Sequence, residues 1–350
     1  MFSFKNDYSE GAHPRILEAL SQVNLQQDEG YGEDRFSLAA IATIKQLIGS
    51  ETADVHMLVG GTQTNLIALS AFLRPHEAAI AAATGHISVH ETGAIEATGH
   101  KVLAAEAMLD GKLTVAAIQK VLDAHGDEHM VKPRLVYLSD TTEIGGVYTK
   151  AELTALSRYC HAHQLLLYLD GARLGSALSA AGNDVSLADL PQLTDAFYIG
   201  GTKNGALLGE ALVICNPALQ ADFRYLIKQK GALLAKGRLL GIQFTELFRD
   251  GLFFELAGHA NQMAARLSEA ITGAGFSFLT EPKSNQIFPI FPDRLVTALE
   301  HEFGFMRWQK FDGQQTAIRL VTSWATTEEA VAAFTDFLTV NTGAASASIN

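Results

Sequence analysis

The stretch AFYIGGTKNGALLGEALVIC (196–215) sets a single lysine, Lys203, between two apolar runs. The runs 196–199 and 211–215 have the composition of buried strands. A lysine held close to a hydrophobic core gives up its proton more readily than a lysine in water, which suits it for Schiff-base chemistry. The ordinary alternative is a solvated lysine in a glycine-rich turn. The choice between the two depends on the rest of the chain.

Similar apolar runs alternate with helical patterns through the first half of the chain. Helices are expected at 61–73 and 150–163. Continuous apolar strands joined by helices favour a mainly parallel sheet covered by helices on both faces, which is an α/β fold. The expected strands of this sheet are 55–60, 77–83, 134–140, 165–173, 195–201 and 210–216.

The pattern changes near Asn216 to that of a smaller α+β domain. The segment 217–248 is mostly helical, and a further helix is expected to about Thr272. Short strands follow in FSFLTE, NQIFPIF and AIRLVTSW, before a last helix from Thr327. The predicted division is an N-terminal segment 1–20, a large domain 21–245, a small C-terminal domain 246–340 and a flexible tail 341–350.

Composition excludes several classes of protein. The 350 residues carry a formal net charge of -12, which argues against a nucleic-acid partner held by electrostatics. No apolar run approaches the ~20 residues that span a bilayer, so no membrane association is expected. The N-terminus lacks the long apolar segment of a signal peptide. With only Cys160 and Cys215 present, a reducing cytoplasm is the expected location.

The first expected strand ends in GGTQTN (60–65), directly before a helix. Small residues at a helix N-terminus leave backbone N–H groups free, and such a terminus favours an anion. Thr62 and Thr64 add hydroxyl donors, so the turn is a candidate phosphate site. The alternative is simple capping of the helix by either threonine.

The second expected strand is followed by TGHISVHETGA (84–94), in which His86, His90 and Glu91 cluster. His86 and His90 have the i,i+4 spacing of metal ligands on a helix face. No third ligand with suitable spacing accompanies them, so no metal is expected. Polar decoration of a helix explains the cluster equally well.

The strand in LLLYLDGAR (165–173) ends in Asp170, with Arg173 three residues later. A carboxylate at the end of a buried strand needs a cationic partner. That partner is either Arg173 or the protonated ring nitrogen of a cofactor.

The carboxyl ends of parallel strands meet at one edge of a sheet, where ligands bind. One edge is therefore expected to carry an anion site, a ring-stacking side chain, a buried carboxylate and a lysine. Pyridoxal 5'-phosphate needs this set: an anion site for its phosphate, an acid for its pyridine nitrogen and a lysine for its aldehyde. The order and common position of the pieces favour the functional interpretation of Lys203.

The sequence resembles the low-specificity L-threonine aldolases, which belong to the aspartate-aminotransferase-like (fold type I) pyridoxal-phosphate enzymes and to the threonine aldolase and beta-eliminating lyase family. The resemblance runs across nearly the whole chain in the order of the family. The pieces that carry it are DEGYGEDRFS (28–37), GGTQTN (60–65), GHISVHETGA (85–94), YLDGARL (168–174), GGTKNG (200–205) and RLVTSW (319–324).

The resemblance implies a role for each matching residue. Lys203 forms the Schiff base, Asp170 pairs with the pyridinium nitrogen and His86 stacks on the ring. The residues implied to hold the phosphate are Gly61, Thr62 and Thr202. Arg173 is expected near the phenolic oxygen of the cofactor and the substrate carboxylate. Arg319 is expected to clamp that carboxylate, unless it is an ordinary surface arginine at a strand end.

Further implied residues lie elsewhere in the chain. Tyr31 resembles an active-site tyrosine, and Ser9 is assigned to the substrate. The segment 228–238 resembles the stretch that lends a basic residue to the phosphate of the neighbouring subunit, with Lys228 and Lys230 both open as that residue. A homo-oligomer, dimer or tetramer, with shared active sites is therefore expected.

The implied reaction is aldol cleavage of L-threonine and related β-hydroxy-α-amino acids to glycine and an aldehyde. Some family members have a histidine where this chain has Thr142, so His86 or His90 is the expected base for the β-hydroxyl. A β-eliminating lyase or aminotransferase on the same scaffold remains an alternative, because fold does not determine reaction. A catalytically inactive cofactor-binding homologue is the alternative outside the enzymes.

Overall fold

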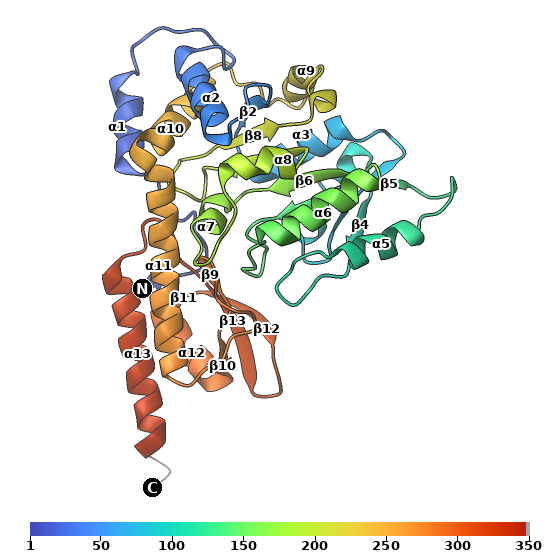
Figure 1. Ribbon diagram of the computed structural model, residues 1–350. Coiled ribbons are helices and arrows are strands. Elements are labelled where there is room, and N and C mark those ends of the chain that lie inside the picture. The colour runs from blue at the N-terminus through green and yellow to red at the C-terminus, as the bar shows by residue number, and fades with distance from the viewer. Residues whose placement is uncertain (348–350) are drawn as a thin grey trace.

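The computed structural model describes residues 1–347, and a seven-stranded sheet forms its larger part (Figure 1). The strands lie in the order β2-β8-β7-β6-β5-β3-β4, and β8 alone runs antiparallel to its neighbours. The bounds are β2 (Asp54–Leu58), β3 (Glu77–Ala82), β4 (Val102–Ala105), β5 (Lys132–Ser139), β6 (Leu166–Asp170), β7 (Ala196–Gly200) and β8 (Glu210–Ile214).

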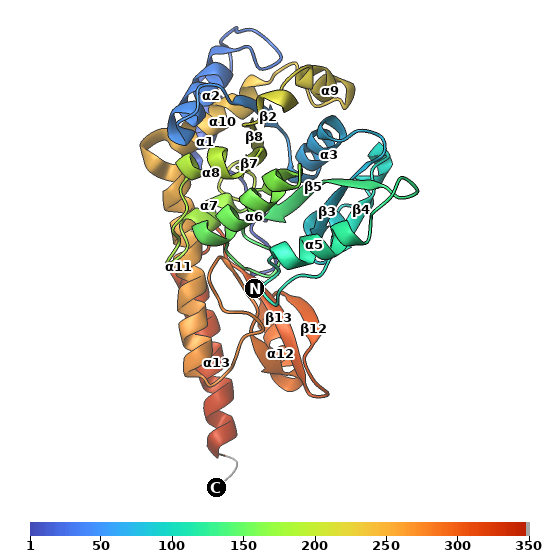
Figure 2. The same ribbon diagram turned by 45° about the vertical axis from the view of Figure 1, so that its right-hand side comes forward.

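Alternate residues of these strands enter two separate apolar cores, one on each face of the sheet. Leu167 and Leu169 of β6 pack into the first core, whereas Leu166 and Tyr168 pack into the second. Figures 1 and 2 show α5 and α6 over the same face of the sheet. The helices packed on this part are α1 (Pro14–Gln22), α2 (Arg35–Ile48), α3 (Gly61–Phe72), α4 (His86–Val89), α5 (Val115–Asp123), α6 (Lys150–Ala162), α7 (Leu174–Leu178), α8 (Leu190–Leu193), α9 (Phe223–Gln229) and α10 (Arg238–Phe248).

A third apolar core lies between two long helices and a small antiparallel sheet. Figure 1 shows α11 running from the large sheet to the small one with α13 beside it. In the small sheet β13 pairs with β9, β10 and β12. The elements are α11 (Leu252–Gly273), β9 (Gln286–Ile287), β10 (Ile290–Pro292), α12 (Asp293–Glu302), β11 (Phe303–Gly304), β12 (Met306–Lys310), β13 (Gln315–Val321) and α13 (Glu328–Ala347).

The predicted strands and helices of the large sheet agree with the structure to within a few residues, and β4 was missed. The first of the three C-terminal strands, FSFLTE, is wrong: this segment makes only an isolated bridge between Phe278 and Pro289. The predicted flexible tail 341–350 stays a prediction: α13 continues to Ala347, and residues 348–350 lie outside the described residues.

The N-terminal segment is part of the C-terminal core. β1 (Phe2–Ser3) pairs with β11, and Phe4 is fully buried against the rings of Phe303 and Phe334. The Phe4 carbonyl accepts a hydrogen bond of 2.9 Å from the backbone N–H of Val321. Residues at opposite ends of the chain thus share one core. Among residues 1–347, none of the helices has the length and apolar character needed to cross a membrane.

Replacing Phe4 with alanine tests this packing. Because the ring is fully buried, Phe4→Ala should lower the free energy of unfolding by ~3–5 kcal/mol through lost burial and a residual cavity. Denaturant unfolding measures the change. Leu25→Ala is the control, since Leu25 is 93% exposed and its loss should be nearly neutral. Equal effects of the two changes would contradict the described packing of the N-terminal segment.

Candidate functional site

Four neighbouring parallel strands end at the same edge of the large sheet and present polar residues there. β3 is followed by His86, β5 by Glu143, β6 ends in Asp170, and β7 is followed by Lys203. Because parallel strands point in one direction, residues far apart in sequence meet at this edge. The structure therefore brings together the lysine, carboxylate and histidine that the sequence analysis selected.

Lys203 lies in the turn after β7, in a strongly desolvated position. Burial lowers its pKa below the ordinary value, and the positive charge of Arg173 acts in the same direction. The carboxylates of Asp7, Asp170 and Glu210 oppose this shift. Burial disfavours the charged form of an amine, so the position promotes a neutral, nucleophilic lysine.

Asp170 is buried at the end of β6, where its carboxylate accepts four hydrogen bonds. Oδ2 accepts from Asn65 Nδ2 at 2.9 Å and from the hydroxyl of Tyr137 at 2.5 Å. Oδ1 accepts from the hydroxyl of Tyr198 and from the backbone N–H of Ala172. Burial alone would raise the pKa of Asp170, but the field of His86 and these donors hold it below its usual value. The carboxylate is therefore ionised at neutral pH and able to pair with a cationic ring nitrogen.

His86 and His90 lie on the short helix α4 and at its end, with ring centroids 5.6 Å apart. The Nδ1 atom of His86 is 2.8 Å from Oε1 of the buried Glu91. His90 is exposed, and partial desolvation followed by the charges of His86, Arg319 and Lys203 lowers its pKa. His90 is therefore neutral at physiological pH. Among residues 1–347, no group of three or more His, Cys, Asp or Glu residues is arranged to hold a metal ion.

Arg173 caps α7 and forms a two-pronged ion pair with Asp7. Its Nε and Nη2 atoms lie 2.7 and 2.9 Å from the two carboxylate oxygens. Asp7 also accepts from Nδ2 of Asn285 at 2.9 Å. Although burial opposes ionisation of Asp7, Arg173 keeps its pKa below the usual value. The sequence analysis left two partners open for Asp170, namely Arg173 and a cofactor ring nitrogen. Arg173 pairs instead with Asp7, which leaves Asp170 available to a cofactor.

Arg319 reaches the same region from β13 of the small sheet. Its Nη2 atom donates to Oε1 of Gln286 at 2.6 Å, and its guanidinium carbon lies 5.9 Å from the centre of the Trp308 ring. Burial, with the charge of Arg173, lowers the pKa of Arg319 to about 10, so it remains cationic at neutral pH. Its buried Nε has no hydrogen-bond partner among the described residues. A buried, unsatisfied cationic donor is the kind of group that binds a carboxylate.

Gly61 begins α3 and lies beside the groups that hold Asp170. A Cβ atom at Gly61 would be 3.0 Å from the hydroxyl oxygen of Tyr198, which itself donates to Asp170. Gly60 caps the helix without a side chain, and the Thr62 side chain is exposed in the first turn. The hydroxyl of Thr64 bonds instead to the Gly60 carbonyl. The first turn of α3 is thus left without side-chain capping, as an anion site requires.

Thr202, expected to hold phosphate, already has two partners. Its hydroxyl donates to Oε1 of Glu210 at 2.8 Å and accepts from the backbone N–H of Gly209 at 3.0 Å. The other carboxyl oxygen of Glu210 accepts from Gly201 at 3.2 Å. Burial raises the pKa of Glu210 to about 8. Thr202 therefore closes the turn that presents Lys203, and its single hydroxyl proton is directed to Glu210.

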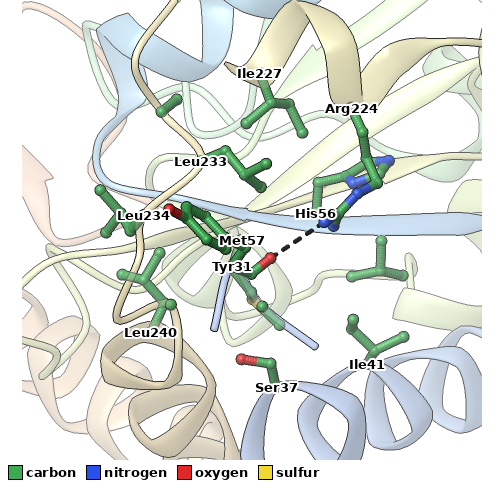
Figure 3. Close-up of a pocket in the computed structure, with 14 residues that line it drawn as sticks. Tyr31, Ser37, Ile41, His56, Met57, Arg224, Ile227, Leu233, Leu234 and Leu240 are labelled. Carbon is green, nitrogen blue, oxygen red and sulfur yellow. Dashed lines mark hydrogen bonds between the residues drawn. The ribbon is translucent and has the colours of Figure 1, made fainter. Parts of the chain in front are cut away.

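Tyr31 lies away from these residues, in a separate groove between α2, α9 and β2 (Figure 3). The groove wall includes His56, and the carbonyl of Tyr31 accepts from Nη2 of Arg224 at 3.3 Å. Lys228 Nζ lies 4.6 Å from the centre of the Tyr31 ring. Lys230 is exposed just after the end of α9. The structure thus pairs Tyr31 with Lys228 at a place distinct from the sheet edge of this chain.

Ser9 and Thr142 each donate a hydrogen bond within the described structure. The Ser9 hydroxyl is exposed and donates to Oδ1 of Asn6 at 2.9 Å. Thr142 is buried and donates to the backbone carbonyl of Asp110 at 2.6 Å, so it cannot replace a histidine base.

The sequence analysis missed several residues that complete the site. They act through contacts between distant segments, which periodicity and local motifs do not reveal. Asn65 was quoted in GGTQTN but given no role, and the tyrosines of β5 and β7 read as ordinary strand residues. The missed residues are Asp7, Asn65, Tyr137, Tyr198, Glu210, Asn285 and Gln286.

Known proteins resemble this chain over most of its length. The beta-eliminating lyase family model matches residues 7–293. The chain is 33% identical over 331 residues to the low specificity L-threonine aldolase of Pseudomonas aeruginosa, covering 94% of each protein. It superimposes on a solved threonine aldolase from Leishmania major with a TM-score of 0.96 and 50% identity, over 98% of this chain and 100% of that one.

A more distant likeness identifies the fold. Aspartate aminotransferase from Thermus thermophilus is 16% identical and gives a TM-score of 0.72 over 96% of this chain and 89% of that one. The predicted aspartate-aminotransferase-like (fold type I) architecture is therefore confirmed. The polar residues at the strand ends agree with these matches. The chain belongs to the beta-eliminating lyase family, among the low-specificity L-threonine aldolases.

Proposed function

We propose that this protein is a carbon–carbon lyase that cleaves L-threonine, L-allo-threonine and related β-hydroxy-α-amino acids to glycine and an aldehyde, with pyridoxal 5'-phosphate as cofactor. The observation that carries the proposal is the desolvated Lys203 after β7 and the ionised Asp170 at the end of the neighbouring strand β6, at one edge of the sheet. Relatives named as threonine aldolases, one of them 50% identical, support the choice of reaction.

The residues of the site fit this cofactor. Lys203 would hold its aldehyde, Asp170 its ring nitrogen and His86 the face of its ring. The first turn of α3, at Gly61 and Thr62, would hold its phosphate; Thr202 could join only by redirecting its hydroxyl from Glu210. When bound, pyridoxal phosphate supplies an electron sink for the pair released as the Cα–Cβ bond breaks.

The arginines and His90 account for binding and proton transfer. Arg319, with its unsatisfied Nε, would bind the substrate carboxylate, and Arg173, held rigidly by Asp7, would lie beside it. This clamp decides which bond of the substrate is aligned for cleavage. His90 is neutral, and the charges of Arg319 and Lys203 both act on it, so we assign it to accept the β-hydroxyl proton. Ser9 would contact the substrate after a local rearrangement of the 6–9 turn, in which its hydroxyl donates to Asn6.

We also infer a homo-oligomer, dimer or tetramer, with shared sites. Tyr31 is 45% exposed, lies against Lys228 and belongs to a groove apart from Lys203 of its own chain. A residue that serves an active site from such a position does so in a neighbouring subunit. A cytoplasmic location, expected from the two cysteines, stays a prediction.

Lys203→Ala tests the reaction and the cofactor together. Loss of the covalent nucleophile should abolish the near-visible absorbance band and reduce threonine cleavage by at least ~10⁴-fold, more than loss of a general base. The assay supplies pyridoxal phosphate and L-threonine and detects acetaldehyde and glycine. Lys101→Ala is the exposed-lysine control. Retained cleavage in Lys203→Ala would contradict the proposal, and pyruvate from serine without acetaldehyde would favour the β-eliminating lyase.

His90→Asn tests the base by pH dependence. A base works only when unprotonated, and the pKa of His90 is lowered, so the acid limb of kcat/KM should lie below pH 6.5. The variant should lose ~10²- to 10⁴-fold in kcat and also lose this limb. His129→Asn, in an exposed loop, is the control. An unchanged acid limb in His90→Asn would assign the base elsewhere.

Lys228→Ala and Lys230→Ala separate the two basic residues. Because Lys228 alone of the two contacts Tyr31, its loss should weaken pyridoxal-phosphate affinity by ~10-fold or more, whereas Lys230→Ala should have little effect. Equilibrium titration with the cofactor measures both.

A mixture of inactive Tyr31→Ala and Lys203→Ala subunits should recover part of the activity if sites are shared. Absence of recovery after verified subunit exchange would contradict sharing.

A further inference from the structure

A continuous chain of hydrogen bonds joins His86 to Asp170. His86 Nδ1 lies 2.8 Å from Glu91 Oε1, and the same oxygen accepts from Asn65 Nδ2 at 2.8 Å. Asn65 Nδ2 also donates to Asp170 Oδ2 at 2.9 Å. The side-chain oxygen of Asn65 accepts from the hydroxyl of Tyr168 at 3.1 Å, which fixes the orientation of its amide. Three segments, α3, the turn after α4 and the end of β6, are linked through this one amide.

The directions of these hydrogen bonds determine the tautomer of His86. Oε1 of Glu91 accepts from Asn65 and lies 2.8 Å from Nδ1 of His86. A carboxylate has no hydrogen to donate, so the Glu91 carboxylate is the acceptor in both bonds. Nδ1 of His86 must then carry a hydrogen, and Nε2 is the second ring nitrogen, turned away from Glu91. The backbone N–H of His86 is held separately, by Glu143 Oε1 at 2.8 Å. Backbone and ring are thus anchored by two different carboxyl groups.

The Glu91 side chain makes no other hydrogen bonds among the described residues. Its side chain is fully buried, yet Oε2 has no hydrogen-bond partner among the described residues. Burying a carboxyl group lowers the stability of the fold unless hydrogen bonds replace its contacts with water. The Glu91 side chain makes two hydrogen bonds, to His86 and to Asn65, and these bonds orient both partners.

We propose that Glu91 is a positioning residue that holds His86 in the Nδ1–H tautomer. Because Asn65 bonds to both Glu91 and Asp170, it fixes the position of His86 relative to Asp170. The inference rests on the proposed function, in which His86 covers one face of the cofactor ring and Asp170 meets its nitrogen. The Glu91 side chain is fully buried and would act through His86 and Asn65. It sets the plane of the stacking ring relative to the carboxylate, and both are tied to the same amide.

The first test needs no change to the site. Long-range ¹H–¹⁵N spectra of the ¹⁵N-histidine-labelled holoenzyme report which ring nitrogen carries the hydrogen, and a His86→Asn sample assigns the signal. The expected result is Nδ1–H for His86. A neutral His86 with Nε2–H would overturn the proposal, whatever the catalytic activity.

Variants then test the consequence. Glu91→Leu removes the acceptor, so His86 should change tautomer and pyridoxal-phosphate affinity should fall ~10- to 100-fold, the effect of losing a hydrogen bond to a charged group. Glu91→Gln keeps an acceptor oxygen and should preserve the tautomer with a smaller loss of affinity. Glu96→Leu and Glu96→Gln, at an exposed glutamate five residues later, are matched controls and should change neither quantity.

The outcomes separate the two proposals. A wild-type protein without cofactor band or threonine cleavage would refute the proposed function, while the tautomer of its His86 would still report on Glu91. An active wild type whose Glu91→Leu variant keeps the tautomer and binds the cofactor within twofold would refute the role of Glu91 alone. If Glu91→Leu does not fold, the wild-type tautomer and Glu91→Gln decide.

Discussion

An ionised carboxylate in an apolar interior must be surrounded by donors, and the architecture of this site follows from that requirement at Asp170. β6 carries Asp170 into the sheet edge after four apolar residues, so water cannot solvate it. The four donors come from α3, β5, β7 and the turn after β6. Each donor therefore constrains the placement of a different element. The field of His86 and the three side-chain donors keep the pKa of Asp170 low despite burial, as pairing with a cationic ring nitrogen would require.

Positive charge at the site is controlled by burial and by neighbouring carboxylates. Burial and neighbouring positive charge lower the pKa of Lys203, while Asp7 neutralises Arg173 and limits the repulsion. Asp7 comes from the N-terminal segment, whose Phe4 is embedded in the C-terminal core. The site thus depends on the chain terminus, the large sheet and the small sheet at once. Through Asp7, the N-terminal segment is connected to Arg173 and Lys203, which lie far from it in the sequence.

Glu210 and Glu91 shape the site by forming hydrogen bonds to other residues of the site. Glu210 binds the backbone N–H of Gly201 and the hydroxyl of Thr202, and so defines the turn that presents Lys203. Glu91 orients an imidazole in a comparable way. In both cases a buried carboxyl group constrains its neighbour, because a hydrogen bond in a low-dielectric interior is stronger than one in water.

The sequence by itself determined the alternation of strands and helices and the strand ends that carry His86, Asp170 and Lys203, whereas Arg319 was selected through the family resemblance. Apolar runs, helical periodicity and polar residues at strand ends are local patterns, and local patterns can be read along one chain. Tertiary structure alone decided that Arg173 pairs with Asp7, that Thr202 serves Glu210 and that Tyr31 lies with Lys228 away from the sheet edge. These contacts join residues through packing in three dimensions, and neither spacing nor composition encodes which distant partner a buried polar group will find.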